Sequence, residues 1–316
     1  MSADFGVCAF SRFGRARRTS LAILLAGVLL GALPLVAFEI PASKPKDTAG
    51  DFSVRWRPPL PVNGSPIVFR VTALEQLKSL SGKWFAHEVF FSSDSHGKVW
   101  YGIAGVSLET SRGNYFLELN GVTTTNKNLP FRKQITVRKG KYHSIVASVP
   151  KQYTEPSAEQ LQKIKQDKTL KEQAFAQVTP EREWAGSFHP PVKAQISDVF
   201  GTARTFNGRV QSVHQGLDYA VPEGTPVAAL NSGKVLLAQP LFFEGNCVVL
   251  DHGQGLLTLY MHLSKIEVKE GEHISTGQKI GVSGGTGRAT GPHLHVAVRW
   301  QGVYLNPATL LTLQLP

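Results

Sequence analysis

The spacing of glycine among short apolar runs, from residue 185 to the C-terminus, constrains the fold more than any other feature. Each run is too short for a core helix, and no apolar repeat with the period of a helix appears there. Short apolar runs that end at glycine are typical of β-strands joined by tight turns. Residues 185–316 are therefore predicted to form a mostly antiparallel β-domain, with strands in "GTPVAALNSGKVLLAQP", "GNCVVLDHG", "LLTLYMHLS", "KIGVSGG" and "HLHVAVRW".

Residues 61–150 carry a second set of strand signals. "SPIVFRVTA" and "NYFLELNG" alternate apolar and polar positions, and "QITVRKGKYHSIVASV" is typical of a hairpin that turns near Gly140. Several short strands over this length predict a small β-sandwich. His87, His96 and His143 are scattered through it without a reactive pattern and are interpreted as surface residues.

Two segments are predicted to connect these parts. Residues 41–60 are rich in Pro, Lys and Ser, which is the composition of a linker. Residues 151–180 contain the glycine-free stretch "TEPSAEQLQKIKQDKTLKEQAFAQ", in which Pro156 and Ser157 can begin a helix. Its apolar stripe is thin, so we expect an exposed linking helix. The predicted fold class is mainly β, with an N-terminal signal or anchor, a β-sandwich, this helix and the C-terminal antiparallel domain.

Residues 1–40 have the pattern of an export signal. The uncharged apolar run "LAILLAGVLLGALPLVAF", residues 21–38, has about the length that spans a bilayer, roughly 17–25 residues. We predict a secretory signal peptide or an uncleaved membrane anchor, and we favour an anchor in the inner membrane with the bulk of the chain in the periplasm or cell envelope. The basic segment before the run contains Arg12, Arg15, Arg17 and Arg18.

The charge of the chain narrows the choice of partner. The formal net charge is +11, which favours an anionic partner such as nucleic acid, phospholipid or a bacterial cell-wall polymer. The export signal argues against nucleic acid. The chain has 2 cysteines, Cys8 and Cys247, and because neither belongs to a C-x-x-C pair, a cysteine zinc site is excluded. Cys247 is interpreted as a buried thiol.

Histidine and aspartate gather in the C-terminal β-domain. "HQGLDYA" contains His214 and Asp218, "LYMHLS" contains His262, and "GPHLHV" contains His293 and His295. If the last segment is a strand, its two imidazoles point to the same face, because side chains alternate with a period of two. Such a pair can be two metal ligands, one ligand and one catalytic group, or two surface histidines.

These residue types suit a catalytic zinc site. Such a site takes three protein ligands and keeps a fourth position for water. His214, Asp218 and one residue of the His293–His295 pair supply that set, which leaves two further histidines as a general base and a transition-state stabiliser. There is no H-E-x-x-H motif to provide a glutamate base, and no serine lies in a G-x-S-x-G elbow.

Over about residues 196–310 the chain resembles the lysostaphin/LytM-type zinc endopeptidases that cut bacterial peptidoglycan. This resemblance implies that His214, Asp218 and His295 bind zinc and that His262 and His293 are the catalytic pair. It also implies a narrow groove with a β-sheet floor and loop walls. The resemblance is carried in order by "DVFGTARTFNG", "HQGLDYAVPEGTPVAALNSGKV", "GNCVVLDHGQGLLTLYMHLSKI", "GEHISTGQKIGVSGGTGRATGPHLHVAVR" and "LNPATLL".

Some positions depart from that pattern or add nothing to the site. Certain relatives carry a tyrosine shortly before the first zinc histidine, whereas "TARTFNGRVQSV" has Phe206 there and offers Arg204 as an alternative donor. His252 is interpreted as a structural residue at a strand end, and Asn246 as a strand-entry residue that can contact the groove.

The predicted function is zinc-dependent hydrolysis of peptide cross-links in peptidoglycan, with one zinc ion per chain. The alternative is a catalytically silent regulator or cell-wall-binding module on the same fold. Two further alternatives are an envelope protein whose N-terminal β-domain binds a partner while the peptidase stays masked, and a secreted protease of ordinary proteins.

Overall fold

The computed structural model describes residues 50–147, 151–153, 155–206 and 210–316. All of them belong to one unit, Pro45–Pro316. The predicted signal or anchor at 1–40 and the first part of the predicted linker lie outside the described residues. Among the helices of the described part, none is long and apolar enough to cross a membrane.

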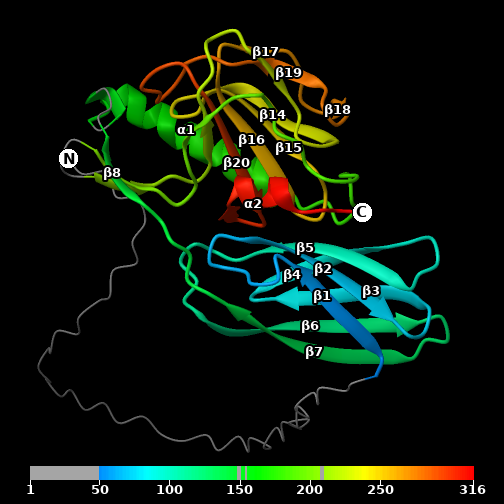
Figure 1. The fold of residues 1–316 in the computed structure, drawn as a ribbon. Coiled ribbons are helices and arrows are strands. Elements are labelled where there is room, and N and C mark those ends of the chain that lie inside the picture. Colours follow the sequence, from blue (N-terminus) through cyan, green and yellow to red (C-terminus); the bar gives the residue numbers. More distant parts are fainter. Residues whose placement is uncertain (1–49, 148–150, 154, 207–209) are drawn as a thin grey trace, which may run out of the picture. The chain divides into compact units, whose positions relative to one another are not determined.

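The N-terminal β region is a folded antiparallel sheet (Figure 1) with the order β1-β2-β5-β4-β3-β6-β7. β4 joins its two halves, because Phe90 pairs with β3 and Phe91 pairs with β5. A parallel bridge between Val62 and Arg138 links the residues before β2 to the end of β7. The strands are β1 (Phe52–Arg57), β2 (Pro66–Ala73), β3 (Leu77–Trp84), β4 (His87–Ser93), β5 (Val99–Gly105), β6 (Gly113–Thr123) and β7 (Asn128–Val137).

Two sequence predictions differ from this region. β1 occupies part of the segment expected to be a linker, and its Phe52 is buried against the sheet. The prediction of a hairpin that turns near Gly140 is wrong. β8 (Ser144–Ala147) does not pair with β7 but pairs in parallel with β10 (Ala203–Phe206). An apolar run shows that a strand forms, yet it does not show which distant strand it joins.

The C-terminal β region contains an eight-stranded antiparallel sheet in the order β18-β14-β15-β16-β20-β12-β9, with β21 beside β20. Two three-stranded sheets accompany it, β13-β19-β17 and β11-β10-β8. The remaining elements are β9 (Ile196–Asp198), β11 (Val210–Val213), β12 (Leu217–Tyr219), β13 (Pro226–Ala228), β14 (Gly233–Leu241), β15 (Gly245–Asp251), β16 (Leu256–Leu263), β17 (Lys265–Ile266), β18 (His273–Ile274), β19 (Lys279–Val282), β20 (Leu294–Trp300), β21 (Val303–Leu305) and α2 (Pro307–Thr312). The prediction of a mainly β chain with antiparallel sheets is confirmed.

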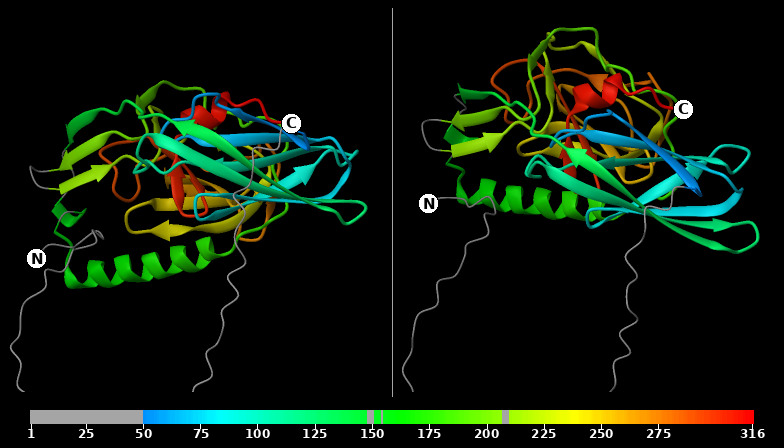
Figure 2. Two further views of the ribbon diagram at one scale, coloured as in Figure 1. Left: turned by 90° about the horizontal axis from the view of Figure 1, so that it is seen from below. Right: turned by 60° about the horizontal axis from the view of Figure 1, so that its bottom comes forward.

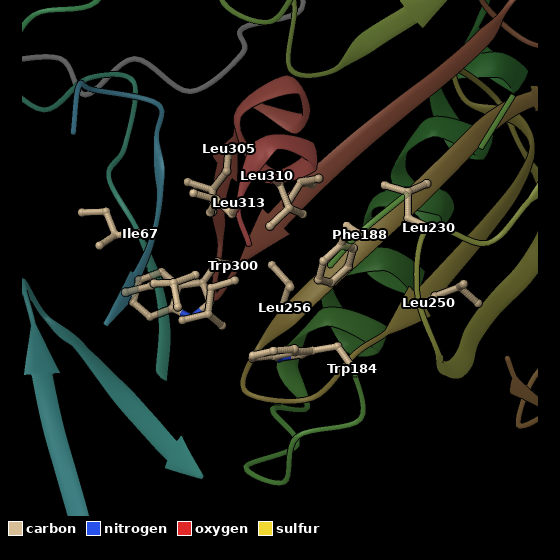
Figure 3. Close-up of a cluster of buried hydrophobic side chains, with 14 of the residues drawn as sticks. Ile67, Trp184, Phe188, Leu230, Leu250, Leu256, Trp300, Leu305, Leu310 and Leu313 are labelled. Carbon is tan, nitrogen blue, oxygen red and sulfur yellow. The ribbon is translucent and has the colours of Figure 1, made fainter. Parts of the chain in front are cut away.

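One hydrophobic cluster runs through both β regions. Ile67 of β2 belongs to the same cluster as Trp300 and Leu305 of the C-terminal region (Figure 3). Gly105 at the end of β5 approaches Leu305 so closely that an added Cβ would lie 2.5 Å from its side chain. Burial of apolar surface therefore stabilises the two regions together.

Helix α1 (Ala158–Ala176) begins at an N-cap Ser157, whose hydroxyl and the Gln160 side chain form a capping box. The helix was expected to be exposed, but it lies beside β14 and β15 (Figure 2). Leu170, Ala174 and Phe175 pack against a second apolar cluster formed by those strands and their neighbours. The thin apolar stripe suffices because buried polar contacts of Asp167 add to the docking, and these contacts do not follow a helical period.

Candidate metal centre

Three of the predicted site residues come from two adjacent strands and the segment just before one of them. Asp218 lies in β12 directly opposite His295 of β20 in the antiparallel register. His214 follows β11, four residues before Asp218. Because paired residues of neighbouring strands lie close together, the register alone brings the carboxylate and the imidazole of this pair together.

The three side chains converge on one point. His214 Nε2 lies 3.1 Å from Asp218 Oδ1 and 3.0 Å from His295 Nδ1, and His295 Nδ1 lies 2.7 Å from Asp218 Oδ1. Within the described part of the chain, this is the one group of three His, Cys, Asp or Glu side chains arranged so that it could hold a metal ion.

The hydrogen-bonding pattern fits a cation. His214 Nδ1 lies 2.9 Å from the carbonyl oxygen of Val199, which can only accept, so Nδ1 donates and Nε2 carries a lone pair. That lone pair points at Asp218 Oδ1, which is also an acceptor. A backbone carbonyl that fixes the tautomer of an imidazole is the usual partner of a metal-binding histidine. Two imidazoles and one carboxylate are a common donor set for a catalytic metal ion.

Electrostatics keep Asp218 and His295 unprotonated. Burial alone would raise the pKa of Asp218, but its contacts with the imidazoles of His214 and His295 hold this pKa below its ordinary value. Burial lowers the pKa of His295, against the opposing effect of Asp218. At neutral pH the site therefore presents the Asp218 carboxylate and the neutral His295 imidazole, the forms that bind a metal.

Arg204 and Asp198 hold the outer side of the centre. Arg204 Nη2 lies 2.9 Å from Asp218 Oδ2, the oxygen that faces away from the histidines. The same guanidinium binds Asp198 through Nε at 3.0 Å and through Nη2. Asp198 Oδ2 also lies 3.4 Å from His214 Nδ1. Arg204 was considered as a substitute for the missing tyrosine, and the structure gives it two carboxylate partners that orient the centre.

The other two histidines lie beside the centre. The rings of His262, in β16, and His293, just before β20, have centroids 4.8 Å apart, and His262 lies 6.0 Å from the ring of His295. Each donates its Nδ1 proton to a backbone carbonyl at 2.8 Å, His262 to Thr286 and His293 to Gly291. The His262 Nε2 atom therefore carries a lone pair, and His293 Nε2 lies 3.9 Å from Asp218 Oδ1.

His262 is held in an uncommon state. Its φ is 61°, in the left-handed region that non-glycine residues rarely adopt. Burial, with the help of the neighbouring imidazoles of His295 and His293, lowers the pKa of His262 to about 3. Backbone strain and a neutral buried imidazole are features that gather at functional sites.

Glycine 216 shapes the seat of His295. A Cβ added at this position would lie 2.4 Å from His295 Nε2 and 2.5 Å from the carbonyl oxygen of Val296. No side chain larger than hydrogen fits between β12 and this ring without moving it. The glycine between His214 and Asp218 therefore belongs to the site, although it contributes no ligand atom.

The remaining candidates lie outside the centre. His252 is fully buried, donates Nδ1 to the Ser232 carbonyl at 2.6 Å and accepts at Nε2 from Thr258 Oγ1 at 2.7 Å, as a structural residue does. The Asn246 amide donates to the Ser264 carbonyl at 3.1 Å. Cys247 is a buried free thiol, and burial raises its pKa.

Sequence reasoning missed several residues that shape the site. Asp198, Gly216 and Thr286 were not singled out, although each lies in a motif that was quoted. A charged residue beside a motif arginine was a usable signal for Asp198. Val199 and Thr286 orient the rings of His214 and His262 through backbone carbonyls, and a carbonyl leaves no side-chain pattern in the sequence.

Comparisons with known proteins identify a peptidase domain in this part of the chain. The model of peptidase family M23 matches residues 212–307. The peptidoglycan DD-endopeptidase ShyA of Vibrio cholerae is 48% identical over 93 residues, which are 29% of this chain and 22% of that protein. ShyC of the same organism is 44% identical over 118 residues, 37% of this chain and 27% of that protein. The chain thus spans less than a third of the length of either relative.

A solved structure extends the likeness beyond the site. A putative M23 peptidase from Pseudomonas aeruginosa is 29% identical, with a TM-score of 0.61, and the match covers 79% of this chain and 95% of that one. The fold and the family match define a peptidase domain built around a His–Asp–His cluster. Residues 212–307 form a peptidase M23 domain, as the sequence resemblance implied.

Proposed function

We propose that the protein is a zinc-dependent endopeptidase that hydrolyses peptide cross-links of bacterial peptidoglycan. The observation that carries the proposal is the convergence of His214 Nε2, Asp218 Oδ1 and His295 Nδ1 within 3.1 Å of one another, beside two uncoordinated imidazoles. Relatives over this domain are named peptidoglycan DD-endopeptidases, which supports cross-link peptides as the substrate class.

His214, Asp218 and His295 would hold the zinc ion. Zinc, when bound, supplies Lewis acidity to a water molecule and to the scissile carbonyl. Arg204 keeps the Asp218 carboxylate turned toward the two imidazoles through its bond to Oδ2. Gly216 leaves room for the His295 ring in the same orientation.

His262 and His293 would move the protons of the reaction. His262 Nε2 is unprotonated and accepts a proton from the attacking water, because its Nδ1 proton is held by the Thr286 carbonyl. His293 is less buried than His262, and it would stabilise the developing oxyanion or help to protonate the leaving amine. The loop between β19 and β20 provides both carbonyls that orient these rings.

The net charge and the proposed cellular location of the chain favour peptidoglycan as the substrate. A protein with a net charge of +11 is attracted to an anionic polymer such as the cell wall. We propose that the chain is exported to the periplasm or cell envelope and is held at the inner membrane by residues 21–38. Fractionation of cells, with alkaline extraction of the membranes, tests this address: an uncleaved anchor stays with the membrane, and a cleaved signal leaves a soluble, shorter chain.

The function is tested by digesting purified peptidoglycan and identifying the released peptides by mass, with the zinc content measured on the same samples. His262→Ala and His293→Ala should retain zinc and lose hydrolysis, whereas His214→Ala and Asp218→Ala should lose both. Zinc bound by a wild-type protein that releases no peptides would instead support the silent regulator. Casein cleavage as fast as peptidoglycan cleavage would support a general secreted protease.

A further inference from the structure

Helix α1 touches the site through the turn at residues 242–244, which joins β14 to β15. Asp167, whose side chain is buried, accepts a hydrogen bond from the Phe242 backbone N–H at 2.7 Å. One turn of helix later, Lys171 forms an ion pair with Glu244. The pair is shielded from solvent, with side-chain exposures of 26% for Lys171 and 13% for Glu244. The helix thus binds the first and the last residue of this turn, Phe242 and Glu244.

The turn at residues 242–244 also contacts the backbone of His262. The Glu244 carbonyl accepts from the His262 N–H at 2.8 Å, and His262 is the residue with a φ of 61°. A residue with this conformation persists only where its surroundings hold it firmly. The hydrogen bond to the turn is one such restraint.

A second path from the turn reaches the His262 imidazole. Asn246, two residues after Glu244, donates its backbone N–H to Thr286 Oγ1 at 2.9 Å. Gly245 packs so tightly on Thr286 that an added Cβ would lie 2.3 Å from Oγ1. The Thr286 carbonyl is the acceptor that fixes the His262 ring. The backbone and the ring of His262 therefore both depend on where this turn lies.

We propose that Asp167 and Lys171 of helix α1 are positioning residues, which act through turn 242–244 to hold His262 in its working orientation. The helix outside the family-matched segment is then part of the working peptidase. This proposal rests on the proposed function insofar as it concerns turnover, and on geometry alone insofar as it concerns the His262 ring.

A buried ion pair suits positioning better than it suits stability. Bringing two charges out of water costs about as much as their attraction returns, so the pair adds little to the free energy of folding. The pair does fix the direction of the Lys171 and Glu244 side chains, because two largely buried charged groups have few other partners. Oε2 of Glu244 is buried without a hydrogen bond in the described structure, so Lys171 makes its hydrogen bond to this side chain at Oε1, and the charge of Arg288 acts on the same carboxylate.

The experiment compares two lysines of the same helix in the full-length protein. Lys171→Met removes the contact with the turn and keeps the aliphatic stem. Lys168→Met is the matched control, because Lys168 is 75% exposed and its ion pair among the described residues is with Glu172 of its own helix, at 3.8 Å. We expect kcat on peptidoglycan to fall about tenfold or more in Lys171→Met with little change in KM and in zinc content, since misplacing a catalytic group costs turnover. Lys168→Met should match the wild type, and Lys171→Arg should recover part of the loss.

A spectroscopic readout separates this proposal from the proposed function. The imidazole ¹⁵N signals of His262 should shift in Lys171→Met and stay in place in Lys168→Met, whether or not the protein cleaves peptidoglycan. An inactive wild type with this difference would overturn the proposed function and leave the positioning role standing. Identical His262 signals and equal kcat in both variants would overturn the positioning role.

A second variant serves as the control for a loss of folding stability in Lys171→Met. Lys171→Met leaves the Glu244 carboxylate buried without its partner, so it can lower the melting temperature. Lys171→Met with Glu244→Gln removes the charge as well and keeps the backbone carbonyl that binds His262. If this double variant melts like the wild type and still loses turnover, the effect is positional. If its turnover equals that of the wild type, the proposal is wrong.

Discussion

The two β regions of the molecule bury different kinds of side chain. Both are antiparallel, and both contribute to one apolar cluster. Among the described residues of β1–β7 and the turns between them, the buried polar side chains are uncharged, namely Asn63, Ser65 and Thr123. The C-terminal region instead buries ionisable side chains, namely His214, Asp218, Asp251, His252 and His262.

This difference shows which region carries chemistry. Burying an ionisable group is costly unless hydrogen bonds or opposite charges compensate, so a chain does it where the group has work to do or is fully bonded. His214, Asp218 and His262 meet at the centre, whereas His252 satisfies both ring nitrogens within the fold. The N-terminal region contributes packing, through residues such as Ile67, and no comparable cluster within its described residues.

The largest expected effect comes from removing the charge at the centre. Asp218→Asn keeps the shape of the side chain but removes the carboxylate that the two imidazoles and Arg204 surround. We expect zinc affinity to fall by more than about a hundredfold and peptide release to stop, because loss of a ligand exceeds the effect of losing its outer partner. Zinc titration checks the affinity. Asp94→Asn, at an exposed turn of the N-terminal region, is the control and should bind zinc like the wild type; equal affinities in both variants would break the contrast.

A second prediction compares a glycine from each region. Gly216→Ala would place a Cβ 2.4 Å from His295 Nε2, whereas Gly113→Ala would meet its nearest atom, in Tyr115, at 3.5 Å. The first change must displace the His295 ring, and we expect a loss of zinc affinity of about a hundredfold at most, as for a lost outer partner. The second change makes an ordinary van der Waals contact and should leave zinc binding and hydrolysis unaltered. Isothermal titration with zinc measures both, and tight zinc binding by Gly216→Ala would contradict the packing argument.

A smaller effect on zinc affinity is expected from Arg204, which bonds to Asp218 on the side away from the two imidazoles. Arg204→Met removes the bond to Asp218 Oδ2 and leaves all three ligand residues present. Zinc affinity should fall by about tenfold to a hundredfold, the usual effect of losing a partner of a ligand. Arg132→Met is the N-terminal comparison, because Arg132 covers Phe116 and pairs with Glu118 at 3.8 Å on the surface. Competition with a chelator of known zinc affinity measures the zinc affinity of both variants. Equal affinities would mean that Arg204 has no role in zinc binding.

The sequence was informative where chemistry lies in side chains close along the chain. His214 and Asp218 stand four residues apart, and the alternation of a strand was enough to suggest that His293 and His295 act together. The structure brings all five predicted residues together, although β20 begins only at Leu294, after His293. The antiparallel β-domain was predicted because its apolar runs end at glycine, which is a local property.

The rest depended on contacts between residues far apart in the chain. Lys171 and Glu244 are separated by 73 positions, and neither looks unusual in its own segment. β8 carries a plain apolar pattern, so its parallel pairing with β10 could not be distinguished from a local hairpin. The tautomers of His214, His262 and His293 are set by backbone carbonyls, which every residue possesses. Long-range polar contacts of this kind have no periodic signature in a single sequence.

The last prediction concerns His252, a buried histidine of the C-terminal region that lies outside the centre. Burial lowers its pKa to about 4, from 6.5 for an ordinary histidine. Above pH 6.5 both the folded and the unfolded chain keep this imidazole neutral. As the pH falls from about 6.5 to about 4, the unfolded chain binds a proton that the folded chain does not, so the free energy of unfolding decreases by roughly 3 kcal/mol from this residue alone.

His252→Gln should remove that part of the pH dependence. The glutamine can still bond to Ser232 and Thr258 but does not titrate, so the free energy of unfolding should change by roughly 3 kcal/mol less between pH 7 and pH 4 than in the wild type. Urea unfolding of zinc-free protein at several pH values measures this, and zinc binding at neutral pH should stay unchanged. An equally steep pH dependence in the variant would mean that the ionisable groups of the centre, and not His252, govern acid unfolding. Burial of ionisable groups in the C-terminal region would then matter for stability only where those groups also form the site.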